Sequence, residues 1–363
     1  MQNKLIKLAL IGCGRIAGHH FKSIKNYKMI KIIAVCDLKK KKAQEYSKKY
    51  KVPHFSNYHE MFKSFPSITH VSIMTPSGMH YENAIDIIKK YKKNIIVEKP
   101  TFLKPDQVKH AFKLAKKNKV KIYPVFQNRY NKAVKRLRGA INNKELGEIR
   151  LVGVRVRWCR PDRYYNLSAW RGTYSHDGGA LTNQGIHHID LLRYLFGEVI
   201  ELNAQMKTLG ANIEVEDSVV ATMRLKKNII GTLEVTTAAR PHDYEASISV
   251  LGSKGMAQLG GWAVNELNEF SPKEGDCKKF SEKIPDAYGY GHKQFYKDLV
   301  IDVLGKKKFP IDEKDCFKTI KLLNAFYKSS EINKKVNVKK VGLSKKLGRK
   351  NEKISNLYRY EKN

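Results

Sequence analysis

The sequence has few cysteines, few acidic residues and no long apolar run. Its five cysteines lie far apart without a CxxC pair, so we expect neither a disulfide framework nor a metal site. Their odd number and apolar surroundings are typical of a reducing compartment. No stretch of about 18 apolar residues is present to span a bilayer, and residues 1–11 hold only a short apolar run that leads into a glycine turn. We therefore expect a cytoplasmic protein without a signal peptide.

The scarcity of acidic residues leaves a large positive charge. The 363 residues include 70 Lys and Arg against 34 Asp and Glu, a formal net charge of +36. Such a charge can indicate a nucleic acid or a membrane surface as partner. The 55 lysines, however, are spread over the polar faces of nearly every predicted helix and do not form one stripe with interleaved aromatics. We attribute the charge to a lysine-rich composition and expect no nucleic-acid partner and no membrane insertion.

The N-terminal part begins with a dinucleotide-binding pattern. The apolar run Leu5–Ile11 stops at Gly12-Cys13-Gly14-Arg15-Ile16-Ala17, and a helical pattern follows. In such a G-x-G-x-x-A turn Gly12 permits the tight bend, Gly14 lets the backbone approach a pyrophosphate, and Ala17 lets the helix pack on the strand. The N–H groups at the helix N-terminus then face the phosphates.

An acidic residue strengthens this interpretation. The second apolar run, Ile30–Cys36, ends at Asp37, twenty residues after Ala17, where a carboxylate should meet the adenosine ribose hydroxyls. A carboxylate there repels a 2′-phosphate, so NAD is favoured over NADP. Lys39 and Lys40 weaken that discrimination, and a cap on the next helix is the alternative role for Asp37.

Strand and helix patterns then alternate as far as residue 126, which predicts a doubly wound parallel sheet, an α/β fold. Ligands of such sheets bind outside the carboxyl ends of the strands. The residues expected at these ends are Thr75, Pro76, Glu98, Lys99, Pro100 and Gln127.

From about Arg150 the apolar period changes to two, with Val152, Val154 and Val156 alternating against polar residues. Several such stretches predict an antiparallel sheet with one polar or partner-covered face. The expected domains are 1–128, to which a helix near 315–330 can return, 129–332, and a lysine-rich tail over 333–363. Residues 159–200 interrupt the second domain, and long insertions of this kind usually carry function.

Four motifs together resemble the glucose-fructose oxidoreductase and inositol dehydrogenase (Gfo/Idh/MocA) family over residues 4–335: the glycine turn, Thr75-Pro76 with His80, Glu98-Lys99-Pro100, and the Gly178-Gly179 pair before His187. The resemblance implies an NAD-binding Rossmann domain followed by an open-faced α+β domain, paired sheet to sheet in dimers or tetramers. The cofactor-binding residues expected are Gly12, Gly14, Arg15, Ile16, Asp37, Thr75, Pro76, His80, Glu98, Lys99 and Gln127.

A narrower resemblance links Arg163–Thr173 and Asn183–Asp190 to bacterial UDP-N-acetylglucosaminuronate 3-dehydrogenases, which serve surface polysaccharide synthesis. It implies oxidation of the C3 hydroxyl of a UDP-linked sugar acid. Much of the broader family has aspartate at the position of Asn183, and the subgroup shares the asparagine. A neutral amide cannot raise the basicity of the histidine by charge, so we expect proton abstraction to depend more on Lys99 or solvent.

Oxidation of a secondary alcohol requires a hydride acceptor, a base and a group that stabilises the alkoxide. NAD can supply the first, His187 is the expected base, and Lys99 is the expected electrostatic partner. Asn183, four residues before His187, shares its helical face and can position the hydroxyl. The alternatives are a core or capping histidine and a surface lysine. We predict that Lys99 and His187 converge on one substrate beside the nicotinamide.

Further residues are candidates for substrate contacts. Arginine forks suit phosphates and carboxylates, and aromatic rings can stack on uracil or sugar, although ordinary surface and packing roles are equally compatible with the sequence. The candidates are Arg129, Arg163, Arg171, Trp170, Tyr164, Tyr165 and His292. Three other functions stay open: a free-sugar or cyclitol dehydrogenase, a keto-sugar reductase, and a non-catalytic NAD-binding regulator.

Overall fold

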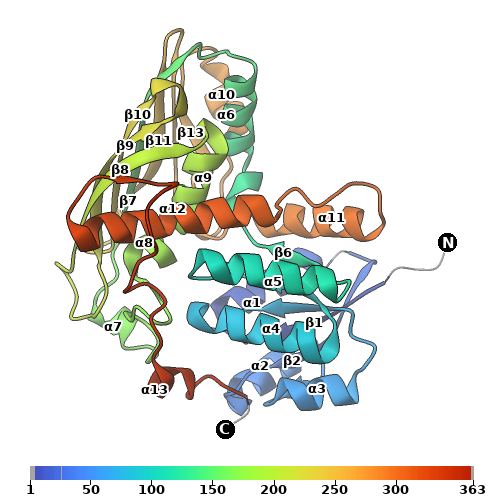
Figure 1. The fold of residues 1–363 in the computed structure, drawn as a ribbon. Helices are drawn as coiled ribbons and strands as arrows, with labels where there is room; N and C mark the ends of the chain where they lie inside the picture. The colour runs from blue at the N-terminus through green and yellow to red at the C-terminus, as the bar shows by residue number, and fades with distance from the viewer. Residues whose placement is uncertain (1–4, 26, 361–363) are drawn as a thin grey trace. The chain divides into compact units, whose positions relative to one another are not determined.

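The computed structural model describes residues 5–25 and 27–360, which divide into two units. Unit 1 takes its described residues from the ranges 1–125, 292–317 and 350–363, and unit 2 consists of residues 126–291 and 318–349. The long helix α12 (Glu313–Ile332) contributes residues 313–317 to unit 1 and the rest to unit 2. Each unit contains one sheet and its own buried core (Figure 1).

Unit 1 is built on a six-stranded parallel sheet in the order β3-β2-β1-β4-β5-β6. Its strands are β1 (Ile6–Ile11), β2 (Ile30–Cys36), β3 (His54–Phe55), β4 (His70–Ile73), β5 (Asn94–Val97) and β6 (Ile122–Pro124). The strand order reverses between β1 and β4, the switch point where doubly wound sheets bind ligands. The predicted α/β fold class is confirmed, and β2 and β5 have the predicted bounds.

Helices connect these strands. They are α1 (Arg15–Ile24), α2 (Lys40–Tyr50), α3 (Tyr58–Ser64), α4 (His80–Tyr91) and α5 (Pro105–Lys117), with the short turn η1 (Ser77–Met79) before α4. Helix α11 (Gly291–Val303) follows much later in the chain and belongs to unit 1 from His292 on. The apolar spacing in α4 has its expected effect, since Ala84, Ile87 and Ile88 are fully buried while its lysines are exposed.

Unit 2 contains an eight-stranded mixed sheet in the order β13-β12-β11-β7-β10-β9-β8-β14. The strands are β7 (Ile149–Arg157), β8 (Val199–Lys207), β9 (Ser218–Leu225), β10 (Ile230–Thr236), β11 (Glu245–Gly252), β12 (Met256–Gly260), β13 (Glu266–Phe270) and β14 (Val336–Asn337). The prediction of a purely antiparallel sheet is wrong at one place: β7 and β10 pair in parallel. Period-two alternation reports which face a side chain occupies, and it carries no information on strand direction.

Among the described residues, helices cover one face of this sheet and leave apolar side chains exposed on the other. The helices and turns of unit 2 are η2 (Gln127–Tyr130), α6 (Lys132–Asn142), α7 (Asp162–Tyr165), α8 (Gly179–Asn183), α9 (Ile186–Phe196), η3 (Lys226–Asn228) and α10 (Gly275–Phe280), with most of α12. Figure 1 shows α6, α9 and α10 beside the same face. On the opposite face Val220 and Ile230 are 61% and 57% exposed.

The C-terminal region contains two short elements. Strand β14 pairs with β8 in unit 2, and helix α13 (Glu352–Ser355) belongs to unit 1. Across residues 5–25 and 27–360, none of the helices combines the length and the hydropathy needed to cross a membrane.

Candidate functional site

The glycine turn of unit 1 has the geometry of a phosphate-binding loop. Gly12 has a φ of +99°, and a Cβ there would lie 2.6 Å from the carbonyl oxygen of Met74, so only glycine fits without strain. A Cβ on Gly14, in contrast, would meet nothing within 4 Å. Gly14 precedes α1, whose first turn has no acidic residue and no side-chain cap. This open approach to a helix N-terminus suits the pyrophosphate of a dinucleotide.

Asp37 lies beside this turn at the carboxyl end of β2. Its Oδ2 accepts a hydrogen bond from the backbone N–H of Cys13 at 2.8 Å, and its Oδ1 accepts one from Lys39 at 2.8 Å. These contacts fix the carboxylate next to the glycine turn, where a ribose diol would bind. The alternative cap role is not seen, because the N-cap of α2 is Lys39 and no side chain caps that helix.

His80 joins two loops at the carboxyl edge of the sheet. Its Nδ1 lies 2.8 Å from the carbonyl oxygen of Pro100, and its Nε2 lies 2.9 Å from that of Thr75. Burial lowers the pKa of His80, and a neutral imidazole donates to only one of these carbonyls. The Thr75 hydroxyl donates to Asn83 at 2.9 Å. His80 therefore holds the loop after β5 against the loop after β4, and its contact with a cofactor stays a prediction.

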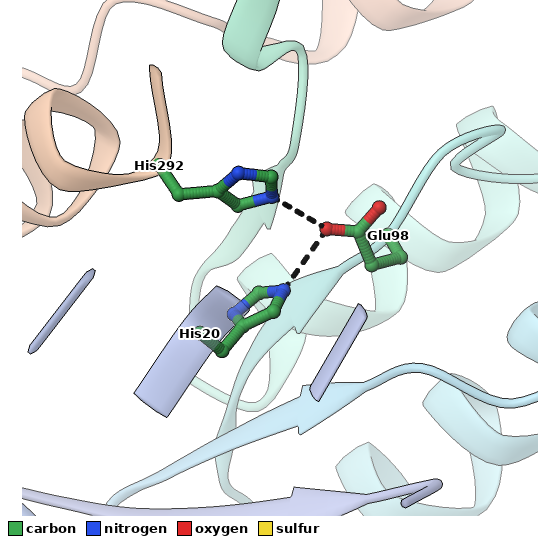
Figure 2. A group of neighbouring side chains, drawn as sticks. All are labelled: His20, Glu98 and His292. Atoms are coloured by element: carbon green, nitrogen blue, oxygen red, sulfur yellow. Dashed lines mark hydrogen bonds and ion pairs between the residues drawn. The ribbon is translucent and has the colours of Figure 1, made fainter. Parts of the chain in front are cut away.

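Glu98 is the centre of a buried hydrogen-bonded cluster (Figure 2). Its Oε1 lies 3.0 Å from Nε2 of His20 and 3.2 Å from Nε2 of His292. Its Oε2 accepts the backbone N–H of Lys99 at 3.2 Å. On its other side, His20 Nδ1 lies 2.6 Å from the hydroxyl of Tyr296. The carboxylate thus receives three donors and holds the backbone of the lysine expected to act in catalysis.

The protonation states follow from burial and from these bonds. Burial alone would raise the pKa of Glu98, yet the hydrogen bonds from His20 and His292 hold it well below its usual range. Burial lowers the pKa of His20, so its imidazole is neutral. A neutral His20 that donates from Nε2 accepts at Nδ1, which matches the Tyr296 hydroxyl as donor.

The same three side chains have the composition of a metal site. Their ligand atoms lie within 4.8 Å of one another, which one divalent cation could bridge. We interpret the group as hydrogen-bonded, because two N–H donors and the Lys99 amide already satisfy the carboxylate. His292 is only 1% exposed, and its Nε2 faces Glu98. Its expected substrate contact stays a prediction.

In unit 2, His187 and Asn183 each have a defined neighbour. His187 is 8% exposed, and its Nε2 lies 3.2 Å from Nε2 of Gln127. When the Gln127 amide donates here, His187 carries its proton on Nδ1 and Nε2 is the basic nitrogen. The Asn183 amide donates to the buried carboxylate of Asp177, whose other oxygen accepts the N–H of Gly172 at 2.8 Å. Sequence reasoning did not single out Asp177.

Arg129 forms a buried ion pair. Its Nε and Nη2 donate to the two carboxylate oxygens of Asp190, both at 2.7 Å, and Thr319 donates to the same carboxylate at 3.0 Å. Arg129 and Asp190 are 6% and 1% exposed. Because Asp190 lies one turn after His187 on α9, this pair positions the helix that carries the histidine. The arrangement gives the guanidinium of Arg129 a structural role, and its expected contact with substrate stays a prediction.

The other substrate candidates lie around α7. The guanidinium of Arg171 stacks over the rings of Tyr164 and Trp170 at 4.3 and 4.6 Å and donates to the Tyr164 hydroxyl. Tyr165 is buried and its hydroxyl lies 2.9 Å from that of Thr237, an arrangement that serves packing. Arg163 is exposed. The structure therefore brings Tyr164, Trp170 and Arg171 into one cluster. Tyr165 meets the Tyr164 ring edge to face, with centroids 5.1 Å apart, and Arg163 is not among these contacts.

The glycine pair before α8 has a steric cause that sequence reasoning missed. Gly178 and Gly179 have φ values of +81° and +83°, and a Cβ on Gly179 would lie 2.2 Å from the carboxylate of Glu216. Glu216 is 2% exposed and accepts from the Tyr327 hydroxyl at 2.7 Å and from the Leu181 N–H at 3.1 Å. Burial raises its pKa to about 8. The positive φ values and the contact with Glu216 cannot be read from a sequence, so sequence reasoning could not find this cause.

Two family models match the chain. The oxidoreductase family with an NAD-binding Rossmann fold matches residues 6–126, and the GFO/IDH/MocA C-terminal domain matches residues 134–258. The chain belongs to the Gfo/Idh/MocA family and is an NAD-dependent oxidoreductase. The predicted family, cofactor and enzyme class are confirmed.

Two solved structures illustrate the similarity over nearly the whole chain. Both are WlbA dehydrogenases in complex with NADH and UDP-GlcNAcA. The structure from Bordetella pertussis has a TM-score of 0.85 and 30% identity, covering 95% of this chain and 100% of that one. The structure from Chromobacterium violaceum has a TM-score of 0.85 and 32% identity, covering 93% and 97%. A more distant relative, the myo-inositol 2-dehydrogenase of Thermotoga maritima, is 25% identical over 69% of this chain and 74% of its own length.

Proposed function

We propose that the protein oxidises the C3 hydroxyl of a UDP-linked N-acetylglucosaminuronic acid to the 3-keto sugar. The observation that carries this proposal is the 30–32% identity, over 93–95% of the chain, to two dehydrogenases crystallised with NADH and UDP-GlcNAcA. The myo-inositol 2-dehydrogenase of Thermotoga maritima shares 25% identity over a smaller part of the chain. A cytoplasmic location and a role in surface polysaccharide synthesis belong to the same proposal.

The geometry of the glycine turn supports NAD binding independently of these relatives. Gly14 leaves open space before the N-terminus of α1, and the Asp37 carboxylate lies next to this turn. When bound, NAD accepts the hydride from C3 of the sugar. In the proposed reaction Nε2 of His187 accepts the proton of the C3 hydroxyl. Lys99 donates a hydrogen bond to that oxygen as negative charge develops on it. The products are the ketone, NADH and a proton.

Three further features support the assignment of roles. Gln127 is placed to keep Nε2 of His187 as the basic nitrogen. The contact between Glu98 and the Lys99 N–H fixes the backbone from which the lysine side chain extends. The cluster of Tyr164, Trp170 and Arg171 contains aromatic rings and a cation, as a uridine diphosphate would require.

The test is single-turnover reduction of NAD by the purified protein with UDP-N-acetylglucosaminuronic acid, followed at the NADH absorbance band. We expect Lys99→Met to lower the rate by about 10² or more, the scale of one lost electrostatic contact, while NAD binding stays within twofold. Lys89→Met, on the exposed face of α4, is the matched control and should keep the wild-type rate. No reduction with the wild-type protein would reject the substrate, and an active Lys99→Met variant would remove Lys99 from the mechanism.

A free sugar or cyclitol is the second candidate substrate, supported by the similarity to the inositol dehydrogenase. The two candidates differ in one measurement. Protection of the protein from thermal unfolding by UDP alone, in the presence of NAD, is expected for the nucleotide sugar and not for the free sugar. Oxidation of inositol with no effect of UDP would favour the second candidate.

We also propose that a second copy of the chain covers the open face of the unit 2 sheet. Four exposed apolar side chains form a continuous row in register across adjacent strands: Met256 pairs with Leu251, Leu251 with Leu151, and Leu151 with Ile230. These side chains are 38–57% exposed. An apolar row of this kind is typical of a protein interface, and the family resemblance implies pairing through this sheet.

A further inference from the structure

The C-terminal segment 350–360, called the C-terminal segment below, belongs to unit 1 although the residues before it belong to unit 2. It contains α13, whose N-cap Asn351 accepts the N–H of Ile354 at 3.2 Å. Figure 1 shows it in dark red at the side of unit 1 that holds α2 and α3. Two of its residues contact the carboxyl edge of the parallel sheet.

Arg359 anchors the segment to the start of α4. Its Nε and Nη2 donate to the two carboxylate oxygens of Glu82 at 3.0 and 3.1 Å. Its Nη1 donates to Glu352 at 2.6 Å and to Asn356 at 2.7 Å within the segment. A guanidinium held by four acceptors has little remaining freedom. Glu82 lies in the first turn of α4, just beyond the carboxyl end of β4.

Tyr360 reaches the carboxyl end of β2. Its ring centroid lies 4.6 Å from that of Tyr58 on α3. Burial raises the pKa of the Tyr360 hydroxyl, and the nearby groups Cys36 and Asp37 act in the same direction. The next residue after Cys36 is Asp37, the expected partner of the adenosine ribose.

The segment therefore connects the two strand ends between which the adenosine of a dinucleotide lies in this class of fold. It also leaves the binding groups accessible. The oxygens of Asp37 accept backbone N–H groups of Cys13 and Lys39. The Cβ position of Gly14 is open. The C-terminal segment therefore lies beside the expected adenosine site without occupying its binding groups.

We propose that the C-terminal segment forms one wall of the adenosine end of the NAD site, with Tyr360 as a cofactor-binding residue and Arg359 as its anchor through Glu82. The inference depends on NAD binding alone and is independent of the identity of the sugar. Its converse, a segment that occupies the adenosine site and competes with NAD, predicts effects of opposite sign.

The test is calorimetric titration of the cofactor-free protein with NAD, ADP-ribose and nicotinamide mononucleotide. Tyr360→Ala should weaken NAD and ADP-ribose about tenfold, the scale of one lost aromatic contact, and leave the mononucleotide unchanged. Arg359→Met should act in the same direction. Leu357→Ala, an exposed side chain of the same segment, is the matched control and should bind NAD as the wild type does.

Limited digestion with trypsin gives a second readout that does not require a folded variant. NAD and ADP-ribose should slow cleavage after Lys353 and Arg359 in the wild-type protein, and nicotinamide mononucleotide should not. Affinities within twofold of the wild type for Tyr360→Ala, together with unchanged digestion, would show that the segment only packs on unit 1. Tighter NAD binding by Tyr360→Ala would show that the segment competes with the cofactor, and either result overturns the proposal.

Discussion

Replacing Glu98 by glutamine should destabilise unit 1 strongly, although the side chain keeps its size. The carboxylate accepts N–H groups from His20 and His292 on one oxygen and from the Lys99 backbone on the other. The amide oxygen of Gln can keep the two imidazoles, but its NH₂ group then faces the Lys99 N–H. One hydrogen bond to a charged group is lost, at about 1.5–3 kcal/mol, and a buried donor is left without an acceptor, at about 1–3 kcal/mol.

The expected sum is about 4 kcal/mol, because Glu98 is only 4% exposed and water cannot replace the lost partner. For a unit of this size we expect the melting temperature at pH 7 to fall by about 10 °C. The measurement is thermal unfolding followed by circular dichroism. Glu45→Gln, an exposed residue of α2, is the matched control and should change the melting temperature by less than 2 °C.

The pH dependence has a defined sign. The pKa of Glu98 in the fold lies below its ordinary value of 4.5, so its contribution is fully present above pH 4.5 and is lost as the pH falls through the lower value. The wild-type protein should therefore lose stability in acid more steeply than Glu98→Gln. A melting temperature for Glu98→Gln within 2 °C of the wild type at pH 7, or parallel acid profiles, would refute the hydrogen-bond network.

Two further predictions concern unit 2. The pKa of Glu216 is about 8 in the fold against an ordinary 4.5, so the stability of the protein falls as the pH rises between these values. In urea unfolding, Glu216→Gln should leave the stability nearly unchanged at pH 5 and raise it by a few kcal/mol at pH 9. Equal effects of the substitution at both pH values would contradict a buried, protonated Glu216. Ile230→Lys should reduce the particle mass in light scattering, whereas Leu209→Lys in the loop after β8 should not; an unchanged mass would contradict pairing through the open sheet face.

The sequence predicted the strands that are written as short, mostly apolar runs. Ile30–Cys36 and Asn94–Val97 are strands at the predicted bounds because a buried parallel strand is an apolar run with a sharp polar end. The two-residue strand β3 and the short helix α3 were missed, since neither is long enough to show a period. Helix α6 was also missed, although Ala133, Val134 and Leu137 form its buried face, because basic residues separate them.

The sequence indicated which residues carry the chemistry of the site, but not which residues they contact. Glu98 was expected beside Lys99, but its two imidazoles come from 78 and 194 residues away in the sequence, and no local pattern carries such distances. Arg129 was expected to meet an anion, and the anion it meets is Asp190 of its own chain. A sequence indicates that a guanidinium needs a carboxylate or phosphate, and the fold decides whether that group comes from protein or ligand.

Asn183 shows how such a partner changes the meaning of a substitution. Considered alone, an amide in place of the carboxylate found in much of the family removes negative charge near His187. In the structure the Asn183 amide donates to Asp177, which is 1% exposed. A carboxylate therefore still lies one hydrogen bond away from the side chain at position 183. An aspartate at position 183 would place a second carboxylate in contact with the buried Asp177 and raise the pKa of one of the two. The Asn183 amide instead donates its N–H to Asp177, so a hydrogen bond replaces the repulsion between two carboxylates.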